Sequence, residues 1–478
     1  MRQPADIAAS RRTKLVCTIG PASAERIAAL AAAGMDVARI NLSHGTPASH
    51  AEAAHSVHRV ALADNRPLAV LTDLAGPKIR LGALAGGSAN LETGRPFVLR
   101  VSGARTGDAS GAHVSYKRMG ADVRIGDPIF LADGAAALRV TAIDDGIHTE
   151  VVRGGTVRSR AGVAIPASRL STAALTAKDR SDIPRVIELG ASYVGQSFVR
   201  SADDVLELRR LLGSEGPHIV AKIETRPAVE SFDAILGVSD AVMIARGDLG
   251  VEMPYEEVPV IQKQLVRRAL DRGVPTIVAT QMLESMTAAH RPTRAEASDV
   301  ANAVFDGADA IMLSAETAIG AYPLQAAEAA TRIASFCEAQ GAAFLPAGRS
   351  QPPGTDGDAL AFAAVALTTA DRGVKAICCY TRTGRTARVL SSLRPPVPII
   401  AFSPDAETVE RLALVNAVIP RPCAPLGESE RVEQLLRLVG ESDLVSDGTP
   451  VVLVSSTAMP GSAPNRVGVH RVALASDP

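Results

Sequence analysis

Short apolar runs alternate with amphipathic stretches along most of the chain, a pattern typical of repeated strand–helix units. The amphipathic stretches at residues 24–34, 204–213 and 256–273 carry apolar side chains at helical spacing. Four glycines are placed to end helices, namely Gly34, Gly190, Gly213 and Gly273. The apolar runs predict eight strands, at residues 14–20, 37–43, 67–73, 193–198, 218–224, 241–247, 276–281 and 310–316. Eight strand–helix units favour an α/β fold, the TIM (β/α)8 barrel.

The repeat is interrupted once, between Asp73 and about residue 167. This segment has no clear helical pattern, and Gly and Asp turns separate its short β-like runs, at residues 96–101, 124–132 and 136–143. We interpret residues 75–166 as a small β-barrel domain inserted after the third strand, so the TIM barrel domain comprises residues 1–74 and 167–342. An insert at this position is suited to act as a lid that closes over the barrel mouth.

A second α/β pattern follows a Pro- and Gly-rich stretch at residues 347–358. It predicts helices at residues 359–371 and 384–393, and strands at 374–380, 397–403, 450–456 and 467–472. We interpret residues 343–478 as a separate C-terminal α/β domain.

Composition and charge narrow the class of protein. The chain has 478 residues, too many for one ordinary core, and its net charge of −1 gives no general attraction to nucleic acid or to membranes. Its five cysteines lack metal-binding spacing and are expected to be reduced thiols. Because no secretory or membrane-length apolar run is present, we expect a cytoplasmic protein without a nucleic-acid or membrane partner.

Polar residues gather at the carboxyl ends of the predicted strands, where a TIM barrel carries its active site. Lys222 and Glu224 alternate along one strand, so their side chains share a face. The other strands supply Arg39, Asn41, Ser43, Asp73, Gly247, Asp248, Thr280 and Ser314. Taken singly, each has an ordinary alternative, such as a solvated ion pair. Taken together they favour a functional site, because burying such charges for packing alone would cost several kcal/mol per ion.

The residue types indicate a class of reaction. Glu224 and Asp248 offer the hard oxygen ligands that Mg²⁺ prefers, whereas Lys222 and Arg39 suit a phosphoryl group in transfer. Neither a GxxxxGK[ST] loop nor a GxGxxG fingerprint after a strand is present. The barrel mouth itself is therefore expected to bind phosphate.

Several stretches resemble pyruvate kinases, including "TKLVCTIGPAS", "GMDVARINLSHG", "VMIARGDLGVE" and "RPTRAEASDVANAVFDGADAIMLSAETAIGAYP". The resemblance spans the whole barrel, and the insert and C-terminal domain follow in the same order. It implies transfer of a phosphoryl group from phosphoenolpyruvate to ADP, giving pyruvate and ATP, the last step of glycolysis. It further implies Mg²⁺ or Mn²⁺ as cofactor, a homotetramer, and control by a phosphorylated allosteric effector.

Carried over position by position, the resemblance implies roles for the strand-end residues. Lys222 would stabilise the phosphoryl group in transfer and the enolate, and Arg39 would contact the phosphate. Glu224 and Asp248 would ligate the divalent ion, and the substrate carboxylate would meet the N–H groups of Gly247 and Asp248 and the Thr280 hydroxyl. Thr280 and Ser314 would deliver a proton through water. The implied nucleotide contacts are Arg80, Lys178, His44 and Asn41, and the implied monovalent-cation pocket is Asn41, Ser43, Asp73 and the Leu74 carbonyl.

One stretch departs from the common family pattern, because Leu74-Ala75-Gly76-Pro77-Lys78 stands where Thr-Lys-Gly-Pro-Glu is usual. In the family, Glu at the position of Lys78 accompanies dependence on K⁺, and Lys accompanies independence. We therefore expect a bacterial-type enzyme in which the Lys78 ammonium substitutes for the ion, so that K⁺ is not required. The alternative is a solvated lysine on the first strand of the insert.

A candidate effector site lies in the C-terminal domain, at Thr381-Arg382-Thr383-Gly384-Arg385-Thr386. This loop joins a predicted strand to a predicted helix and offers hydroxyl and N–H groups to a phosphate. The closing loop, residues 455–466, lacks the tryptophan and basic grip that some family members use for a sugar bisphosphate. We therefore expect a monophosphate, such as a sugar monophosphate or AMP. The alternative is a helix-capping turn with solvated arginines.

Two other functions compete with an active kinase. A catalytically silent, metabolite-sensing homologue would have lost Lys222, Glu224, Asp248 or Thr280, and all four are present. Another barrel enzyme acting on phosphoenolpyruvate or an enolate, such as a carboxylase or an aldolase-type lyase, is disfavoured by the inserted β domain and by the run from Arg39 to His44.

Overall fold

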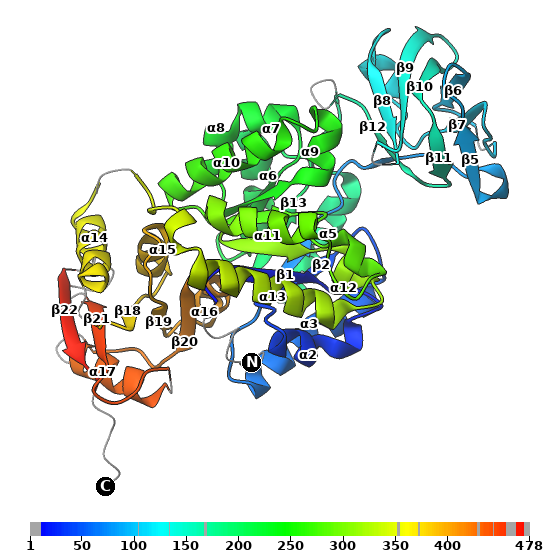
Figure 1. Cartoon of the computed structure of the whole chain (residues 1–478). Coiled ribbons are helices and arrows are strands. Elements are labelled where there is room, and N and C mark those ends of the chain that lie inside the picture. Colours follow the sequence, from blue (N-terminus) through cyan, green and yellow to red (C-terminus); the bar gives the residue numbers. More distant parts are fainter. Residues whose placement is uncertain are drawn as a thin grey trace.

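The computed structural model describes residues 11–103, 105–132, 134–166, 170–350, 354–370, 373–427, 431–442, 444–455 and 465–472. Three bodies follow one another in Figure 1, with the barrel between the inserted domain and the C-terminal domain. Residues 167–169, at the expected second boundary of the insert, lie outside the described residues, as do residues 456–464 of the closing loop. Within the described part of the chain, no helix combines the length and apolar character needed to cross a membrane.

The central body is a closed barrel of eight parallel strands, as the sequence predicts. Its strands are β1 (Lys14–Thr18), β2 (Val37–Asn41), β3 (Ala69–Asp73), β13 (Tyr193–Gln196), β14 (His218–Ile223), β15 (Ala241–Ala245), β16 (Thr276–Ala279) and β17 (Ala310–Leu313), and they pair in the order β1-β17-β16-β15-β14-β13-β3-β2. Six of the eight, among them β15 and β16, are buried at every position, which explains their continuous apolar runs.

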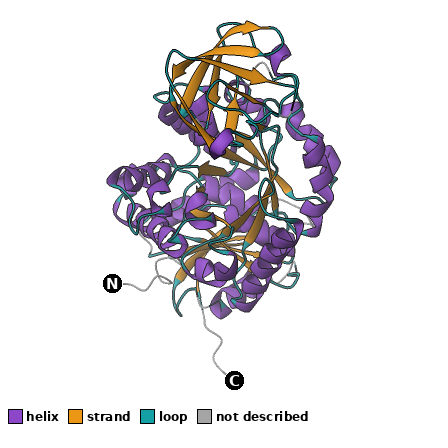
Figure 2. Cartoon of the chain, turned by 90° about the vertical axis from the view of Figure 1, so that its right-hand side faces the viewer, coloured by secondary structure: helices purple, strands orange, loops and turns teal. Residues whose placement is uncertain are grey.

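Helices surround the barrel strands, as Figure 2 shows. They are α2 (Ile27–Ala32), α3 (Pro47–Ala63), α5 (Ala177–Glu188), α6 (Ala202–Leu212), α7 (Arg226–Glu230), α8 (Phe232–Leu236), α9 (Arg246–Glu252), α10 (Val258–Arg272), α11 (Arg294–Asp306), α12 (Ala315–Ala318) and α13 (Pro323–Gln340). Capping boxes at Thr46, Thr176 and Thr293 begin α3, α5 and α11. Gly273 ends α10 in the left-handed conformation, as expected of a terminal glycine.

The inserted domain leaves the barrel after β3 and is almost entirely β structure. Its strands are β4 (Ile79–Arg80), β5 (Ser88–Leu91), β6 (Pro96–Arg100), β7 (Gly111–His113), β8 (Pro128–Leu131), β9 (Ala136–Ile143), β10 (Ile147–Arg153), β11 (Gly155–Arg158) and β12 (Gly162–Ala164), with the short 3₁₀ turn η2 (Ala85–Gly87) and the short helix α4 (Met119–Asp122). Seven form a sheet in the order β4-β12-β8-β9-β10-β6-β7. The Gly82 N–H donates to the His113 carbonyl at 2.7 Å and the Ser115 N–H to the Arg80 carbonyl at 2.9 Å. These bonds join the two edges of the sheet into a small barrel.

The C-terminal domain is a five-stranded sheet with helices against it. Its elements are α14 (Asp356–Thr369), β18 (Ala376–Tyr380), α15 (Arg385–Ser392), β19 (Ile399–Ser403), α16 (Ala406–Arg411), β20 (Val418–Pro422), α17 (Arg431–Glu441), β21 (Pro450–Ser455) and β22 (Arg466–Arg471). The strand order is β20-β19-β18-β21-β22, and only β22 is antiparallel to its neighbour. Of these elements, β20, α16 and α17 are additions to the sequence prediction.

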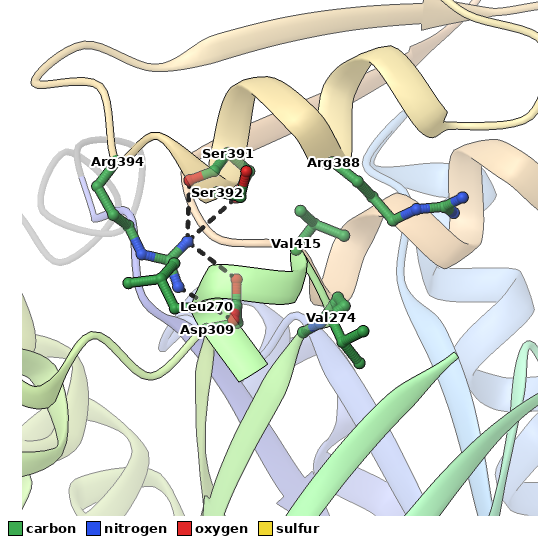
Figure 3. Close-up of a pocket in the computed structure, with 10 residues that line it drawn as sticks. Leu270, Val274, Asp309, Arg388, Ser391, Ser392, Arg394 and Val415 are labelled. Carbon is green, nitrogen blue, oxygen red and sulfur yellow. Dashed lines mark hydrogen bonds and ion pairs between the residues drawn. The ribbon is translucent and has the colours of Figure 1, made fainter. Parts of the chain in front are cut away.

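The C-terminal domain packs against the amino ends of the barrel strands. The short 3₁₀ turn Leu412–Leu414 (η6) places Leu414, fully buried, in the same apolar cluster as Met243 and Met312 of the barrel. Figure 3 shows the Arg394 guanidinium directed at Asp309 in a small cavity beside this contact. Arg394 forms an ion pair with Asp309 at 3.1 Å and donates to the Gly307 carbonyl at 2.6 Å. The buried Arg394–Asp309 ion pair and the buried Leu414 side chain therefore hold the C-terminal domain against the barrel.

Candidate active site

The carboxyl ends of the barrel strands surround a cavity of about 100 Å³. Its walls contain most of the residues that the sequence singles out: Arg39, Asn41, Ser43, Asp73, Leu74, Lys78, Lys222, Glu224, Asp248, Thr280 and Ser314. Ala75, Ser197, Phe198, Met243, Ala245 and Met312 complete the lining. A larger cavity of about 830 Å³ opens beside it and is lined by Gly247 together with Lys78, Asp248, Thr280 and Ser314. The two cavities together bring the predicted catalytic, substrate and metal residues to one place.

A buried network of charges forms one wall of the smaller cavity. The Arg39 guanidinium is paired with the Asp73 carboxylate, with Nε 3.0 Å from Oδ2, and it also donates to the Thr18 hydroxyl at 3.1 Å. The Lys222 ammonium lies 3.7 Å from Asp73 Oδ2 and 3.1 Å from Glu224 Oε2. Two cations and two carboxylates thus alternate in space, which lowers the cost of burying any one of them.

The network favours the charged forms of Lys222 and Asp73. Burial alone would lower the pKa of Lys222, but the Asp73, Glu224 and Asp248 carboxylates outweigh it and raise that pKa above its usual value. For Asp73, burial would raise the pKa, whereas Lys222 and Arg39 lower it below its usual value. An ammonium and a guanidinium therefore face the cavity as permanent positive charges, available to an anionic ligand.

Glu224 is the exceptional carboxyl of this site. Burial raises its pKa to about 7, opposed by Lys222 and reinforced by the Asp248 carboxylate. Its Oε1 accepts a hydrogen bond from the Phe198 backbone N–H at 2.7 Å. A carboxylate that is desolvated beside another carboxylate gains a favourable partner when a divalent cation binds between them. With two oxygen donors on one cavity, Glu224 and Asp248 fit Mg²⁺ or Mn²⁺, which take their remaining ligands from substrate and water.

Thr280 and Gly247 meet in the larger cavity, which both residues line. The Gly247 N–H, in the first turn of α9, donates to the Thr280 hydroxyl at 2.7 Å, and that hydroxyl donates to the Ala279 carbonyl at 2.6 Å. Thr280 has φ +72°, a left-handed conformation that β-branched residues rarely adopt. Arg246 holds this backbone in place, because its guanidinium donates to the Thr280 carbonyl at 2.7 Å and to Asp299 at 2.6 Å.

The predicted nucleotide residues lie outside the smaller cavity, apart from Asn41. Lys178 donates to the Leu42 carbonyl at 3.0 Å and pairs with Asp182 at 2.5 Å, and Arg80, on the lid strand β4, donates to the Arg160 carbonyl at 3.2 Å. Partial desolvation and the cations Arg80, Lys78 and Arg39 lower the pKa of His44. His44 is therefore close to the positive charges of both lid and barrel.

The predicted monovalent-cation pocket has one unusual atom. Asp73 Oδ1 is buried and accepts no hydrogen bond from the part of the chain that the structure describes. The Leu74 side chain is buried, and its carbonyl accepts a hydrogen bond from the Ser197 hydroxyl at 2.8 Å. Lys78 is exposed and lines the same cavity, and it forms no ion pair with any described residue. Lys78 and the Asp73 carboxylate, which has an unpartnered oxygen, thus line one cavity.

The candidate effector loop belongs to the C-terminal domain, on the far side of the barrel from the lid (Figure 1). It leaves β18 at Thr381, whose N–H donates to the Phe402 carbonyl at 2.9 Å, and enters α15 through Gly384 with φ +75°. The Arg382 carbonyl accepts from the Thr408 hydroxyl at 2.9 Å. The side chains of Arg382, Thr383 and Arg385 are exposed.

Sequence reasoning did not single out Ser197 and Phe198, which follow β13 directly. The Lys222 ammonium donates to the Ser197 hydroxyl at 2.7 Å, and Phe198 holds Glu224. A signal was available, because Ser197 is a polar residue at the same end of a predicted strand as the others.

Comparisons with known proteins agree with this geometry. The family model "Pyruvate kinase, barrel domain" matches residues 10–327, and "Pyruvate kinase, alpha/beta domain" matches residues 358–470. A pyruvate kinase of Clostridium perfringens is 38% identical over 94% of this chain and 98% of its own length. One from Mycobacterium intracellulare is 39% identical over 97% and 99%. A solved structure of a pyruvate kinase from Cryptosporidium parvum superposes with a TM-score of 0.87 at 31% identity, covering 98% of this chain and 97% of that one. The chain belongs to the pyruvate kinase family.

Proposed function

We propose that this enzyme transfers the phosphoryl group of phosphoenolpyruvate to ADP, forming pyruvate and ATP in the last step of glycolysis. The observation that carries the proposal is the position of the Lys222 ammonium. It lies within 3.7 Å of two buried carboxylates, in a cavity that also contains Arg39, Asp248 and Thr280. A permanent cation held beside a divalent-metal site is what a phosphoryl group in transfer requires.

The chain's own groups divide the work. Lys222 and Arg39 offset the negative charge of the phosphoryl group, and Lys222 also faces the enolate that the group leaves behind. The Gly247 and Asp248 N–H groups and the Thr280 hydroxyl hold the substrate carboxylate. Thr280 and Ser314 line both cavities, which supports a role in passing a proton through water to the methylene carbon.

Glu224 and Asp248 would hold the divalent cation, Mg²⁺ or Mn²⁺, which supplies Lewis-acid charge to the substrate oxygens when it is bound. In the proposed reaction ADP accepts the phosphoryl group directly, so the protein needs no covalent nucleophile, and ketonisation of the released enol makes the transfer favourable. The protein has to position its substrates, neutralise charge and exclude water, and the lid is placed for the last of these. Arg80 on the lid and Lys178, His44 and Asn41 on the barrel would contact the nucleotide.

We further propose that activity does not require K⁺. The free Lys78 ammonium lines the cavity that contains the unpartnered Asp73 oxygen, Asn41 and Ser43. At about 4 Å and an effective dielectric constant near 20, one unit charge contributes on the order of 4 kcal/mol. A tethered charge can therefore replace the charge of a bound ion.

Allosteric control through the Thr381–Thr386 loop is the regulatory part of the proposal, with a phosphate monoester as effector. Its exposed Arg382, Thr383 and Arg385 side chains and the start of α15 support phosphate binding. The homotetramer and the cytoplasmic location stay predictions.

A coupled assay of pyruvate formation, run with and without ADP, tests the proposed reaction. We expect pyruvate only with ADP, in a 1:1 ratio to ATP. Pyruvate formed without ADP would indicate another phosphoenolpyruvate enzyme, and no turnover at all would indicate a silent homologue.

Lys222→Met should lower the rate by ~100- to 1,000-fold or more. Lys375→Met, which removes an exposed lysine of the C-terminal domain, is the matched control and should keep the wild-type rate.

A further inference from the structure

Ser197 and Phe198 connect the two most important side chains of the site. The Ser197 hydroxyl accepts a hydrogen bond from the Lys222 ammonium at 2.7 Å and donates one to the Leu74 carbonyl at 2.8 Å. Ser197 is only 3% exposed, so water does not compete freely for either bond. One hydroxyl thus fixes the ammonium relative to the backbone that leads into the lid.

Phe198 fixes Glu224 in a corresponding way. Its backbone N–H donates to Glu224 Oε1 at 2.7 Å, and its φ is +57°. A bulky aromatic residue rarely adopts this left-handed conformation, and such outliers persist where the surroundings enforce them. The turn aims the Phe198 N–H at one carboxylate oxygen and leaves the other, Oε2, beside Lys222.

The same two residues contact the entrance to the lid. Gly76 lies in the connection between β3 and β4 and has φ +65°. A Cβ atom at Gly76 would lie 2.8 Å from Phe198 Cδ2 and 2.9 Å from Ser197 Cβ. The chain entering the lid is therefore packed directly onto the pair that holds Lys222 and Glu224, and no side chain fits between them.

We propose that Ser197 and Phe198 are positioning residues that set Lys222 and Glu224 and couple both to the lid through Gly76. The proposal rests on the proposed function, because it assigns Lys222 to phosphoryl transfer and Glu224 to the divalent cation. Ser197 positions the Lys222 ammonium, and Phe198 positions the Glu224 carboxylate. Movement of the lid about Gly76 would then shift both side chains.

The roles proposed for Ser197 and Phe198 predict different effects on kcat and on Mn²⁺ affinity. Ser197→Ala should lower kcat by about 10- to 100-fold, the usual effect of losing an outer partner of an active-site group. Its affinity for Mn²⁺, measured on the free enzyme by electron paramagnetic resonance, should stay within about twofold of wild type. Phe198→Val, whose branched side chain disfavours positive φ, should weaken Mn²⁺ binding by about tenfold or more, whereas Phe198→Leu should weaken it less.

Matched controls separate positioning from stability. Ser192→Ala removes an equally buried hydroxyl at the other end of β13, where it bonds to Glu410 at 3.0 Å, and should leave kcat per folded molecule unchanged. Gly76→Ala should lower kcat and weaken Mn²⁺ binding together, each by about tenfold or more. Gly94→Ala also places alanine at a positive φ in the lid, but with no atom within 4 Å, and should change neither value more than about twofold.

The proposal is overturned if Ser197→Ala behaves like Ser192→Ala, or Gly76→Ala like Gly94→Ala. It is equally overturned if Phe198→Val binds Mn²⁺ with wild-type affinity. Failure of the proposed reaction would be seen separately, because wild-type enzyme would then form no ATP, whereas Mn²⁺ binding can be measured without any substrate.

Discussion

The Gly247 N–H donates a hydrogen bond to the Thr280 hydroxyl across 2.7 Å, between the ends of neighbouring strands β15 and β16. Both groups are expected to hold the substrate carboxylate, so substrate binding must exchange this bond for bonds to an anion. Thr280 makes this contact with its backbone at φ +72°. The geometry of the carboxylate site is therefore maintained at the expense of backbone strain.

Replacing Thr280 should distinguish the role of its hydroxyl in the reaction from the effect of its backbone conformation on stability. Thr280→Ala and Thr280→Gly both remove the hydroxyl, and both should lower kcat/KM by ~100-fold or more. The glycine variant should be more stable than the alanine variant by about 1 kcal/mol, because glycine adopts positive φ freely. Chemical unfolding of the two proteins measures this difference.

Ala279 provides the control, since it is the preceding residue and lacks a positive φ. There, Ala279→Gly should be less stable than wild type. If glycine were destabilising at both positions, Thr280 would not be strained.

Asp36 makes acid stability testable away from the active site. Its carboxylate accepts hydrogen bonds from Arg11 at 2.6 Å, from the Leu15 N–H at 2.9 Å and from Arg66 at 3.0 Å. Burial would raise the pKa of Asp36, but Arg11, Lys14 and Arg66 together lower it to about 2. Because the folded-state pKa lies below the unfolded value of 3.8, the stabilisation is complete above pH 4 and is lost as the pH falls through 2.

Asp36→Asn should therefore be less stable than wild type at pH 6, and the difference should narrow on acidification. The linkage relation gives a narrowing of about 1 kcal/mol at pH 3 and about 2 kcal/mol near pH 2. Urea unfolding of both proteins across this range measures it. A difference for Asp36→Asn that stays constant across this range would refute the assignment.

The sequence predicted the barrel and its polar mouth because both depend on local pattern. Lys222 and Glu224 are two residues apart on one strand. Side chains at this spacing point to the same face, and both line one cavity. Contacts between segments that are distant in the sequence could not be predicted from this local pattern. Neither the insertion of Leu414 into the barrel cluster nor the Arg394–Asp309 pair leaves a periodic signal in the sequence.

The backbone conformations of the site were the second feature that the sequence did not predict. Thr280 and Phe198 belong to residue types that avoid positive φ, so local propensity argues against the conformations that the site uses. Such disagreements between local preference and structure are expected where function imposes geometry.

The effector loop can be tested by its response to phosphate monoesters. At low phosphoenolpyruvate, AMP or a sugar monophosphate should increase the rate of wild-type enzyme. Thr383→Ala combined with Arg385→Ala should abolish this response, because it removes an exposed hydroxyl and an exposed cation from the loop, and it should leave the basal rate unchanged. Thr369→Ala combined with Arg437→Ala makes the same chemical change elsewhere on the domain and should keep the response. No response to any sugar phosphate or to AMP would rule out this site.

Lys78 gives the sharpest test of ion dependence. With Mg²⁺ present, wild-type enzyme should be fully active in a buffer whose only other cation is tetramethylammonium, because in the proposal the Lys78 ammonium supplies the charge that K⁺ would bring. Lys78→Glu reverses that charge beside the cavity and should be weakly active. KCl should rescue it only in part, since Leu74 stays apolar where the family usually has threonine. Lys117→Glu, a charge reversal at another exposed lysine of the lid, should keep both the activity and the indifference to K⁺. A wild-type rate that rises by tenfold or more with K⁺ at constant ionic strength, about 1.4 kcal/mol, would show that Lys78 does not replace the ion.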